Sequence, residues 1–144
     1  MINRVTLVGR LGHEVDLRYT SNGTPVTKLR IATDGSYKNA EGVRIEVTDW
    51  HSVVVFGRSA ENCASYIGKG SLVYVEGALK TRKWIDQEKV ERYVTEVIGQ
   101  RIKFLDHRHA DGQAADAVPT PPTDLMADDS GLEEPVPGIN DMRD

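Results

Sequence analysis

Apolar residues in this chain follow two spacings, and the order of these spacings restricts the fold more than any other feature. Over most of residues 4–102, apolar and polar side chains alternate, which is the pattern of half-buried strands. The spacing becomes helical only once, at i, i+3, i+4 and i+7, for Ala60, Cys63, Ala64 and Ile67. The sequence therefore predicts several strands interrupted by one short helix.

Turn-forming residues separate the expected strands. The alternating segments are 4–11, 25–33, about 43–56, 72–83 and 92–102, with a short extended piece at 14–19. Segments 21–23 and 37–42 have turn composition, because Asn and Gly accept positive φ. We expect Ser59 to cap the helix, Gly68 to end it in a left-handed conformation, and the polar segment 84–91 to form a loop.

The resulting order is three strands, one short helix and two strands. A parallel sheet needs a crossover between its strands, and only one helix is expected here. A small, mostly antiparallel sheet with exposed edges tends to close on itself. Five strands with a helix between the third and fourth is the order of the OB-fold barrel. We therefore expect an all-β, five-stranded OB fold over residues 1–105, a fold that binds oligonucleotides.

Charge divides the chain into two segments. Residues 1–105 carry a formal charge of +4, and residues 106–144 carry −8. The nine aromatic residues all lie between Tyr19 and Phe104, and five of the six prolines lie in the second segment. Without aromatic side chains that segment cannot bury enough apolar surface to offset its ordering entropy. We expect residues 106–144 to form a disordered acidic tail.

The sequence gives no sign of a membrane, of a disulfide or of catalysis. Cys63 is the single cysteine, which fits a reducing cytoplasm, and no signal peptide or run of ~18 apolar residues is seen. Glu76 and Asp49 are isolated carboxylates, and residues 107–109 (His-Arg-His) lack further metal ligands. We expect a soluble cytoplasmic protein that is not an enzyme and uses no cofactor or metal.

Three large rings and several cations have the pattern of a nucleotide-binding surface. Trp50 and Phe56 are six residues apart in one strand, so both rings point to the same side, whereas Val53 and Val55 point to the other. Trp84 follows a basic segment. Unpaired bases stack on aromatic rings, and phosphates need positive charge. The candidate cations are Lys28, Arg30, Arg44, Lys80, Arg82 and Lys83. The competing interpretations are that Trp50 and Phe56 belong to the core, and that the cations form an ordinary solvated surface.

Many short motifs resemble the bacterial single-stranded DNA-binding protein (SSB) family. They cover roughly residues 3–104 in order and include NRV at 3–5, VGRLG at 8–12, TDWH at 48–51, VVFG at 54–57, VYVEG at 73–77, LKTRKW at 79–84 and YVTEV at 93–97. The resemblance implies an OB fold, usually a homotetramer, that binds single-stranded DNA in replication, repair and recombination, here in the nucleoid. It implies base stacking on Trp50, Phe56 and Trp84, and near Tyr37. It also implies a subunit contact at His51.

The C-terminal segment departs from that family. The family tail ends in a short acidic and then hydrophobic sequence that docks partner proteins. The nearest equivalent here is Asp128, Asp129, Glu133, Glu134 and Ile139, and five further residues follow it. Replication and repair proteins are therefore expected partners only through an atypical tail. Two interpretations stay open: the tail is a solubilising segment, or it mimics nucleic acid and competes with DNA for the basic surface.

Two other functions remain compatible with the sequence. One is an OB-fold module that binds RNA or assists a larger complex. The other is a structural subunit that uses its barrel edge for protein assembly.

Overall fold

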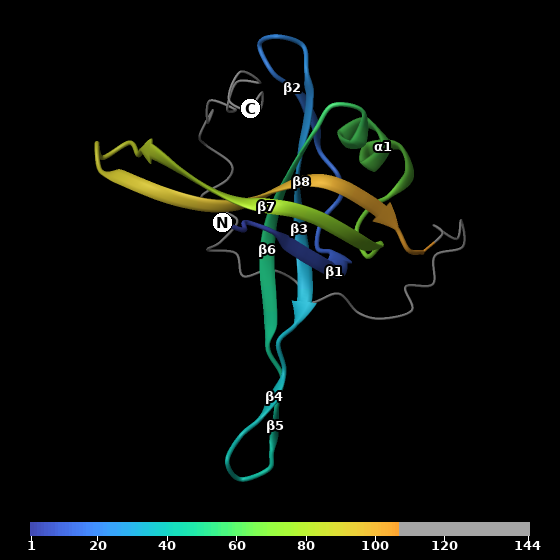
Figure 1. The fold of residues 1–144 in the computed structure, drawn as a ribbon, viewed down its shortest axis with the longest axis vertical. Helices are drawn as coiled ribbons and strands as arrows, with labels where there is room; N and C mark the ends of the chain where they lie inside the picture. The colour runs from blue at the N-terminus through green and yellow to red at the C-terminus, as the bar shows by residue number, and fades with distance from the viewer. Residues whose placement is uncertain (107–144) are drawn as a thin grey trace.

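The structure is a computed structural model that describes residues 1–106, and its strands form a closed barrel (Figure 1). The elements are β1 (Val5–Leu11), β2 (Leu17–Tyr19), β3 (Pro25–Asp34), β4 (Tyr37–Lys38), β5 (Arg44–Ile45), β6 (Thr48–Phe56), α1 (Arg58–Tyr66), β7 (Leu72–Ile85) and β8 (Glu91–Phe104). The predicted all-β class, with one short helix between the third and fourth long strands, is confirmed.

Five strands make the ring. They are joined in the order β1, β7, β8, β6 and β3, and a short pairing between β1 and β3 closes it. The β6–β8 pairing is parallel and the other pairings in the ring are antiparallel. The expected extended piece at 14–19 contains the short strand β2, which pairs with the edge of β3.

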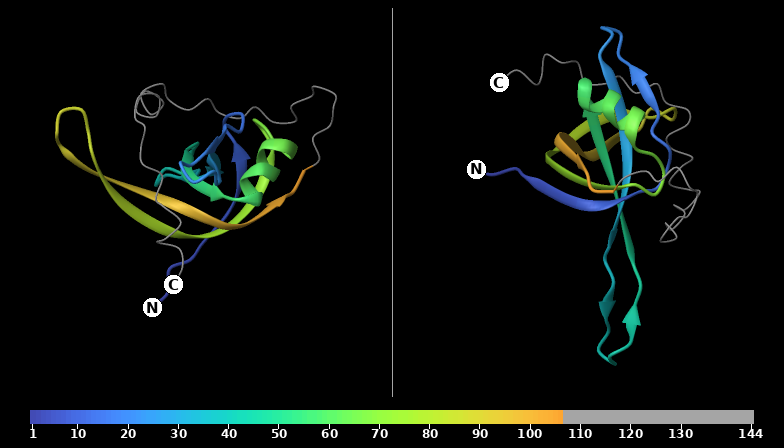
Figure 2. Two further views of the ribbon diagram at one scale, coloured as in Figure 1. Left: turned by 90° about the horizontal axis from the view of Figure 1, so that it is seen from above. Right: turned by 90° about the vertical axis from the view of Figure 1, so that its right-hand side faces the viewer.

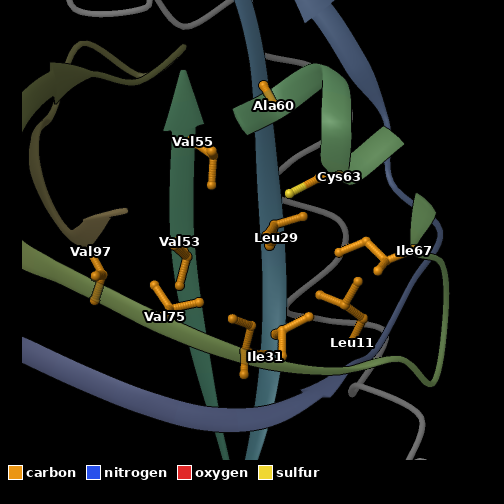
Figure 3. Packing of buried hydrophobic residues seen from close by; sticks show 11 residues of the cluster. Leu11, Leu29, Ile31, Val53, Val55, Ala60, Cys63, Ile67, Val75 and Val97 are labelled. Carbon is orange, nitrogen blue, oxygen red and sulfur yellow. The ribbon is translucent and has the colours of Figure 1, made fainter. Parts of the chain in front are cut away.

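The core lies inside the ring and is made by alternate residues of each strand. Val53 and Val55 are fully buried, as the period-two pattern predicted for the inner side of β6, and so is Ile31 of β3. Helix α1 contributes Ala60 and Cys63 to this core, and Cys63 lies beside Leu29 of β3 (Figure 3). The helix therefore covers one end of the barrel interior with its apolar face.

Two hairpins extend beyond the barrel: the left view of Figure 2 shows the hairpin of β7 and β8, and the right view shows the hairpin of β4 and β5. One is the outer half of β7 and β8, in which pairing continues as far as Ile85 and Glu91. The prediction of a loop from Trp84 to Glu91 is wrong at both ends, because Trp84 pairs with Arg92 and Ile85 pairs with Glu91 inside the ladder. The turn is only residues 86–90, because the Asp86 carboxylate accepts the Glu88 and Val90 N–H groups, both at 2.9 Å.

The second hairpin joins β3 to β6. The expected loop at 37–42 begins with strand β4, and the expected continuous strand 43–56 is interrupted at 46–47. The interruption arises because Val47 donates its N–H to the Ser36 hydroxyl, at 3.2 Å, and not to a ladder partner. At the tip, the Asn39 side chain accepts the Val43 N–H at 2.9 Å, and Gly42 has a φ of 78°. The predicted hairpin is confirmed with different strand limits.

Both predicted helix caps are wrong. The N-cap is Gly57, with φ 68° and no side-chain hydrogen bond, and Ser59 lies inside the helix. Glycine is suited to this N-cap position because the chain leaves β6 through a sharp turn that needs a positive φ. At the other end Ile67 is extended and almost fully buried, so the chain turns back into the core before Gly68. The residue with positive φ is Gly70.

Residue 106 still belongs to the folded unit, one residue beyond the expected boundary. The Asp106 carboxylate accepts the Leu72 N–H at 2.9 Å and pairs with Arg10 at 3.3 Å.

The acidic-tail residues Asp128, Asp129, Glu133, Glu134 and Ile139 lie outside the described residues. Within residues 1–106, no helix has the length and hydrophobicity needed to span a bilayer.

Candidate nucleic-acid interface

The strands β3, β6, β8 and β7 present one continuous exterior surface, which we call the outer face. It is made by the residues whose side chains alternate with those of the core. Its members include Lys28, Arg30, Trp50, Ser52, Val54, Phe56, Lys80, Arg82, Trp84, Glu96 and Ile98. The three rings and four of the six cations that the sequence singled out therefore share one surface.

Trp50 rests on a glycine. The outer edge of its six-membered ring lies against buried Gly12, where an added Cβ would stand 2.8 Å from Cη2 and closer still to Cζ3. That edge of the indole is thus in contact with the glycine. Trp50 as a whole is half-buried, so the indole is held against the barrel without belonging to the core cluster.

Phe56 packs on the exterior of the barrel. Val26, Val54 and Ile98 form a small second cluster on the outer face, and half-buried Phe56 lies against it. This cluster is separate from the main core of Val53 and Val55. The interpretation of Trp50 and Phe56 as core residues is therefore not the one that the structure supports.

Trp84 lies farther out on the same surface, in the projecting part of β7. It stands two residues beyond Arg82 and is half-buried. Its indole Nε1 is buried and finds no hydrogen-bond partner among residues 1–106. Between Phe56 and Trp84, the outer face carries a group of charged side chains.

A buried carboxylate lies among those charges. The Glu96 side chain is 7% exposed, Lys28 Nζ lies 3.1 Å from its Oε1, and Arg82 Nε lies 3.1 Å from its Oε2. Burial by itself would raise the pKa of Glu96, but the hydrogen bond from Arg82 and the charge of Lys28 outweigh it and lower the pKa. Glu96 is therefore ionised at neutral pH.

The cation Arg30 has a neutral partner. Its Nη1 donates to the Ser52 hydroxyl at 2.6 Å, across the β3–β6 ladder. Lys80 stands directly opposite Glu96 on the neighbouring strand. With Lys28 and Arg82, these residues give the outer face an excess of positive charge.

The structure does not bring three other candidates onto this surface. Lys83 points to the opposite side of β7, where Nζ lies 2.6 Å from Glu91 Oε1. Arg44 and Tyr37 belong to the β4–β5 hairpin, where Arg44 Nη2 lies 3.5 Å from Asp34 Oδ2 and Tyr37 is exposed. The hairpin projects away from the barrel (Figure 1).

His51 lies on the side of β6 opposite to the outer face, where it is half-buried and outside the core cluster. Its Nε2 is 2.8 Å from the Thr33 hydroxyl of the neighbouring strand. No group of three or more His, Cys, Asp or Glu side chains within residues 1–106 is arranged to hold a metal ion.

Two residues of this surface were not among the sequence candidates. Gly12 was noticed only as part of a motif, since nothing local shows that an indole lies on it. Glu96 had a detectable signal, because it alternates in phase with Val94 and Ile98 and so stands where a strand usually buries an apolar residue.

A protein-family model and several solved structures are similar to this chain. The model of a family described as "Single-strand binding protein family" matches residues 2–105. A deletion mutant of the single-stranded DNA binding protein from Thermus aquaticus is 32% identical, with a TM-score of 0.66; the match covers 74% of this chain and 52% of that one. The chain thus spans about half the length of that protein. The Plasmodium falciparum SSB in complex with ssDNA has the same identity and TM-score, with 74% of this chain and 96% of that one covered.

Proposed function

The chain belongs to the single-strand binding protein family, and we propose that it binds single-stranded DNA without sequence preference on its outer face. The family consists of DNA-binding proteins and not of enzymes. The observation that carries the proposal is that Trp50, Phe56 and Trp84 lie on one exterior surface with Lys28, Arg30, Lys80 and Arg82 interspersed.

The proposed mechanism combines stacking with charge neutralisation. Each base that stacks on an aromatic ring contributes about 1–3 kcal/mol, whatever its identity, because every base has a π-face. Phosphate contacts fix the path of the strand and carry no sequence information. The outer face offers rings on β6, cations on β3 and both on β7, so a flexible single strand can lay its bases and its phosphates against different parts of one surface.

Alanine variants of the rings test the proposal. Trp50→Ala and Trp84→Ala should each weaken binding of a dT oligomer by about 1–3 kcal/mol. The matched control is Tyr66→Ala, since Tyr66 is an exposed ring on α1 that lies 6.4 Å from Phe104 and away from the outer face. Equal losses in all three variants, or no loss in either tryptophan variant, would contradict the proposal.

RNA binding is the second candidate, and a competition experiment separates it from DNA binding. Stacking alone does not distinguish ribose from deoxyribose, because recognition of RNA uses the 2′-hydroxyl. We expect poly-dT to displace labelled dT more effectively than an RNA oligomer of equal length. Preferential displacement by RNA would favour the RNA-binding alternative.

We further propose that the protein assembles as a homotetramer and acts in replication, repair and recombination in the nucleoid. His51 is the proposed subunit contact, and Tyr37 and Arg44 of the projecting β4–β5 hairpin are proposed to reach DNA beyond the barrel. Residues 107–144, which carry a net negative charge, are proposed to offer a partner-binding segment. These proposals rest on membership of the family and on the charge of the segment.

A further inference from the structure

Glu96 is the one carboxylate on the outer face between Phe56 and Trp84 among the described residues. It comes from β8, and it binds one cation from β3 and one from β7. Both ion pairs measure 3.1 Å. A third cation, Lys80, is its direct neighbour across the β7–β8 ladder. The carboxylate therefore stands where three positively charged side chains converge.

The carboxylate and the two cations that it binds differ in their exposure to solvent. The carboxylate is almost fully buried, whereas the Lys28 and Arg82 side chains are 30% and 17% exposed. Taking a carboxylate out of water is costly unless its partners compensate. In the absence of DNA, Glu96 satisfies cations that would otherwise repel one another on a partly desolvated surface. A phosphate group has the same charge sign and the same acceptor oxygens.

We propose that Glu96 is an internal counter-ion of the DNA-binding surface, which occupies Lys28 and Arg82 until DNA phosphates compete for them. This inference rests on the proposed function, since it assumes that DNA lies on the outer face. Binding then exchanges carboxylate contacts for phosphate contacts at two cations. This exchange limits the affinity for DNA. When no DNA is bound, Glu96 keeps Lys28 and Arg82 ordered.

The decisive variant is Glu96→Gln in the full chain, measured by titration with a dT oligomer at several salt concentrations. The amide keeps the shape and removes the charge, so phosphates no longer compete with a carboxylate. We expect tighter binding at low salt and a log–log salt slope that is steeper by about 0.7 for one more neutralised phosphate. The gain in affinity should therefore shrink about fivefold for each tenfold rise in salt.

Glu91→Gln is the matched control. It makes the same change of charge on the same strand, in an ion pair with Lys83 on the opposite side of the hairpin. We expect its affinity and salt slope to equal those of the unmodified chain. An equal gain in both variants would reveal a general charge effect and overturn the proposal, as would unchanged or weaker binding by a folded Glu96→Gln protein.

A second pair of variants tests the same proposal if Glu96→Gln fails to fold. Lys28 is already bound to a carboxylate, whereas Arg30 is bound to the Ser52 hydroxyl. Lys28→Gln should therefore weaken binding less than Arg30→Gln does at the same salt concentration. The reverse order would overturn the proposal. If the unmodified chain did not bind dT at all, the proposed function itself would fail, and the two failures are distinguishable.

Discussion

At position 12 the side chain is a single hydrogen, and the Trp50 indole occupies the space that a methyl group would need. Contact at the outer edge of the ring restricts its rotation, so less entropy is lost when a base stacks on the indole. We therefore propose that the glycine supports the binding surface without contacting DNA. Its φ is not positive, so backbone strain does not require glycine there.

We therefore expect Gly12→Ala to weaken binding of a dT oligomer by about 1 kcal/mol, which is about fivefold. Acrylamide should quench the displaced indole more strongly. Gly35→Ala is the control, because the atoms nearest to the added methyl would be those of the Asp49 carboxylate, the neighbour of Trp50 in the chain. If the glycine acts through the indole, Gly12→Ala should have no effect in a Trp50→Phe background, and a persisting effect would contradict this account.

The buried thiol of Cys63 makes the stability of the fold depend on pH. Burial against Leu29 and the rest of the core raises the pKa of its thiol from 9.0 to about 11. Because the folded state favours the protonated thiol, its contribution is complete below pH 9 and is lost as the pH rises toward 11. We expect this loss to reach about 2 kcal/mol. Denaturation with urea at pH 8–11 should show a smaller loss for Cys63→Ala than for the unmodified chain; equal losses would exclude the thiol as the cause.

At the scale of the elements, the alternation of β7 decides which cations can share a surface with Trp84. Lys80 and Lys83 lie three residues apart on the same strand but point to opposite sides. Lys80→Gln should flatten the salt slope of DNA binding by about 0.7, and Lys83→Gln should leave it unchanged. Titrations of the two variants over a range of salt concentrations provide the measurement. An equal change in both would show that DNA contacts both sides of the hairpin.

The same strands show what a sequence can and cannot predict. Alternation located the long strands and the inner residues Val53 and Val55, because burial on one side imposes period two on any strand. It failed at Trp84, since residues 84–91 are mostly polar and their composition resembles that of a loop. The apolar spacing predicted the helix but not its caps. The conformations of Gly57 and Ile67 are set by the turn out of β6 and by the return of the chain to the core, which local sequence does not show.

The candidate site was predictable in part for the same reason. The common orientation of Trp50 and Phe56 follows from local geometry. The position of Trp84 relative to them depends on the pairing of β7 with β8, whose register shifts at the irregularity between Glu76 and Gly77. A Cβ at Gly77 would collide with the Ile98 carbonyl oxygen, a contact between distant parts of the chain. Neither that contact nor the pairing of Glu96 with Lys28 is visible in local sequence.

At the scale of the whole molecule, a substitution of His51 tests the proposed homotetramer. His51→Ile places a bulky aliphatic side chain at the proposed contact, and we expect sedimentation to show a shift toward monomer. The substitution also removes the hydrogen bond to Thr33, so Thr33→Val is the control for that loss within one subunit. The assembly should persist in Thr33→Val. An unchanged oligomer in a folded His51→Ile protein would count against the contact.

The central claim is that flat rings and cations on the exterior of the barrel bind unpaired bases and phosphates together. Titration of the full chain with dT oligomers at two salt concentrations, followed by tryptophan fluorescence, tests it most directly. We predict quenching of Trp50 and Trp84 together with an affinity that falls as salt rises, with a log–log slope of about −0.7 per neutralised phosphate. Fluorescence that does not respond to the oligomer, or an affinity that is indifferent to salt, would contradict it.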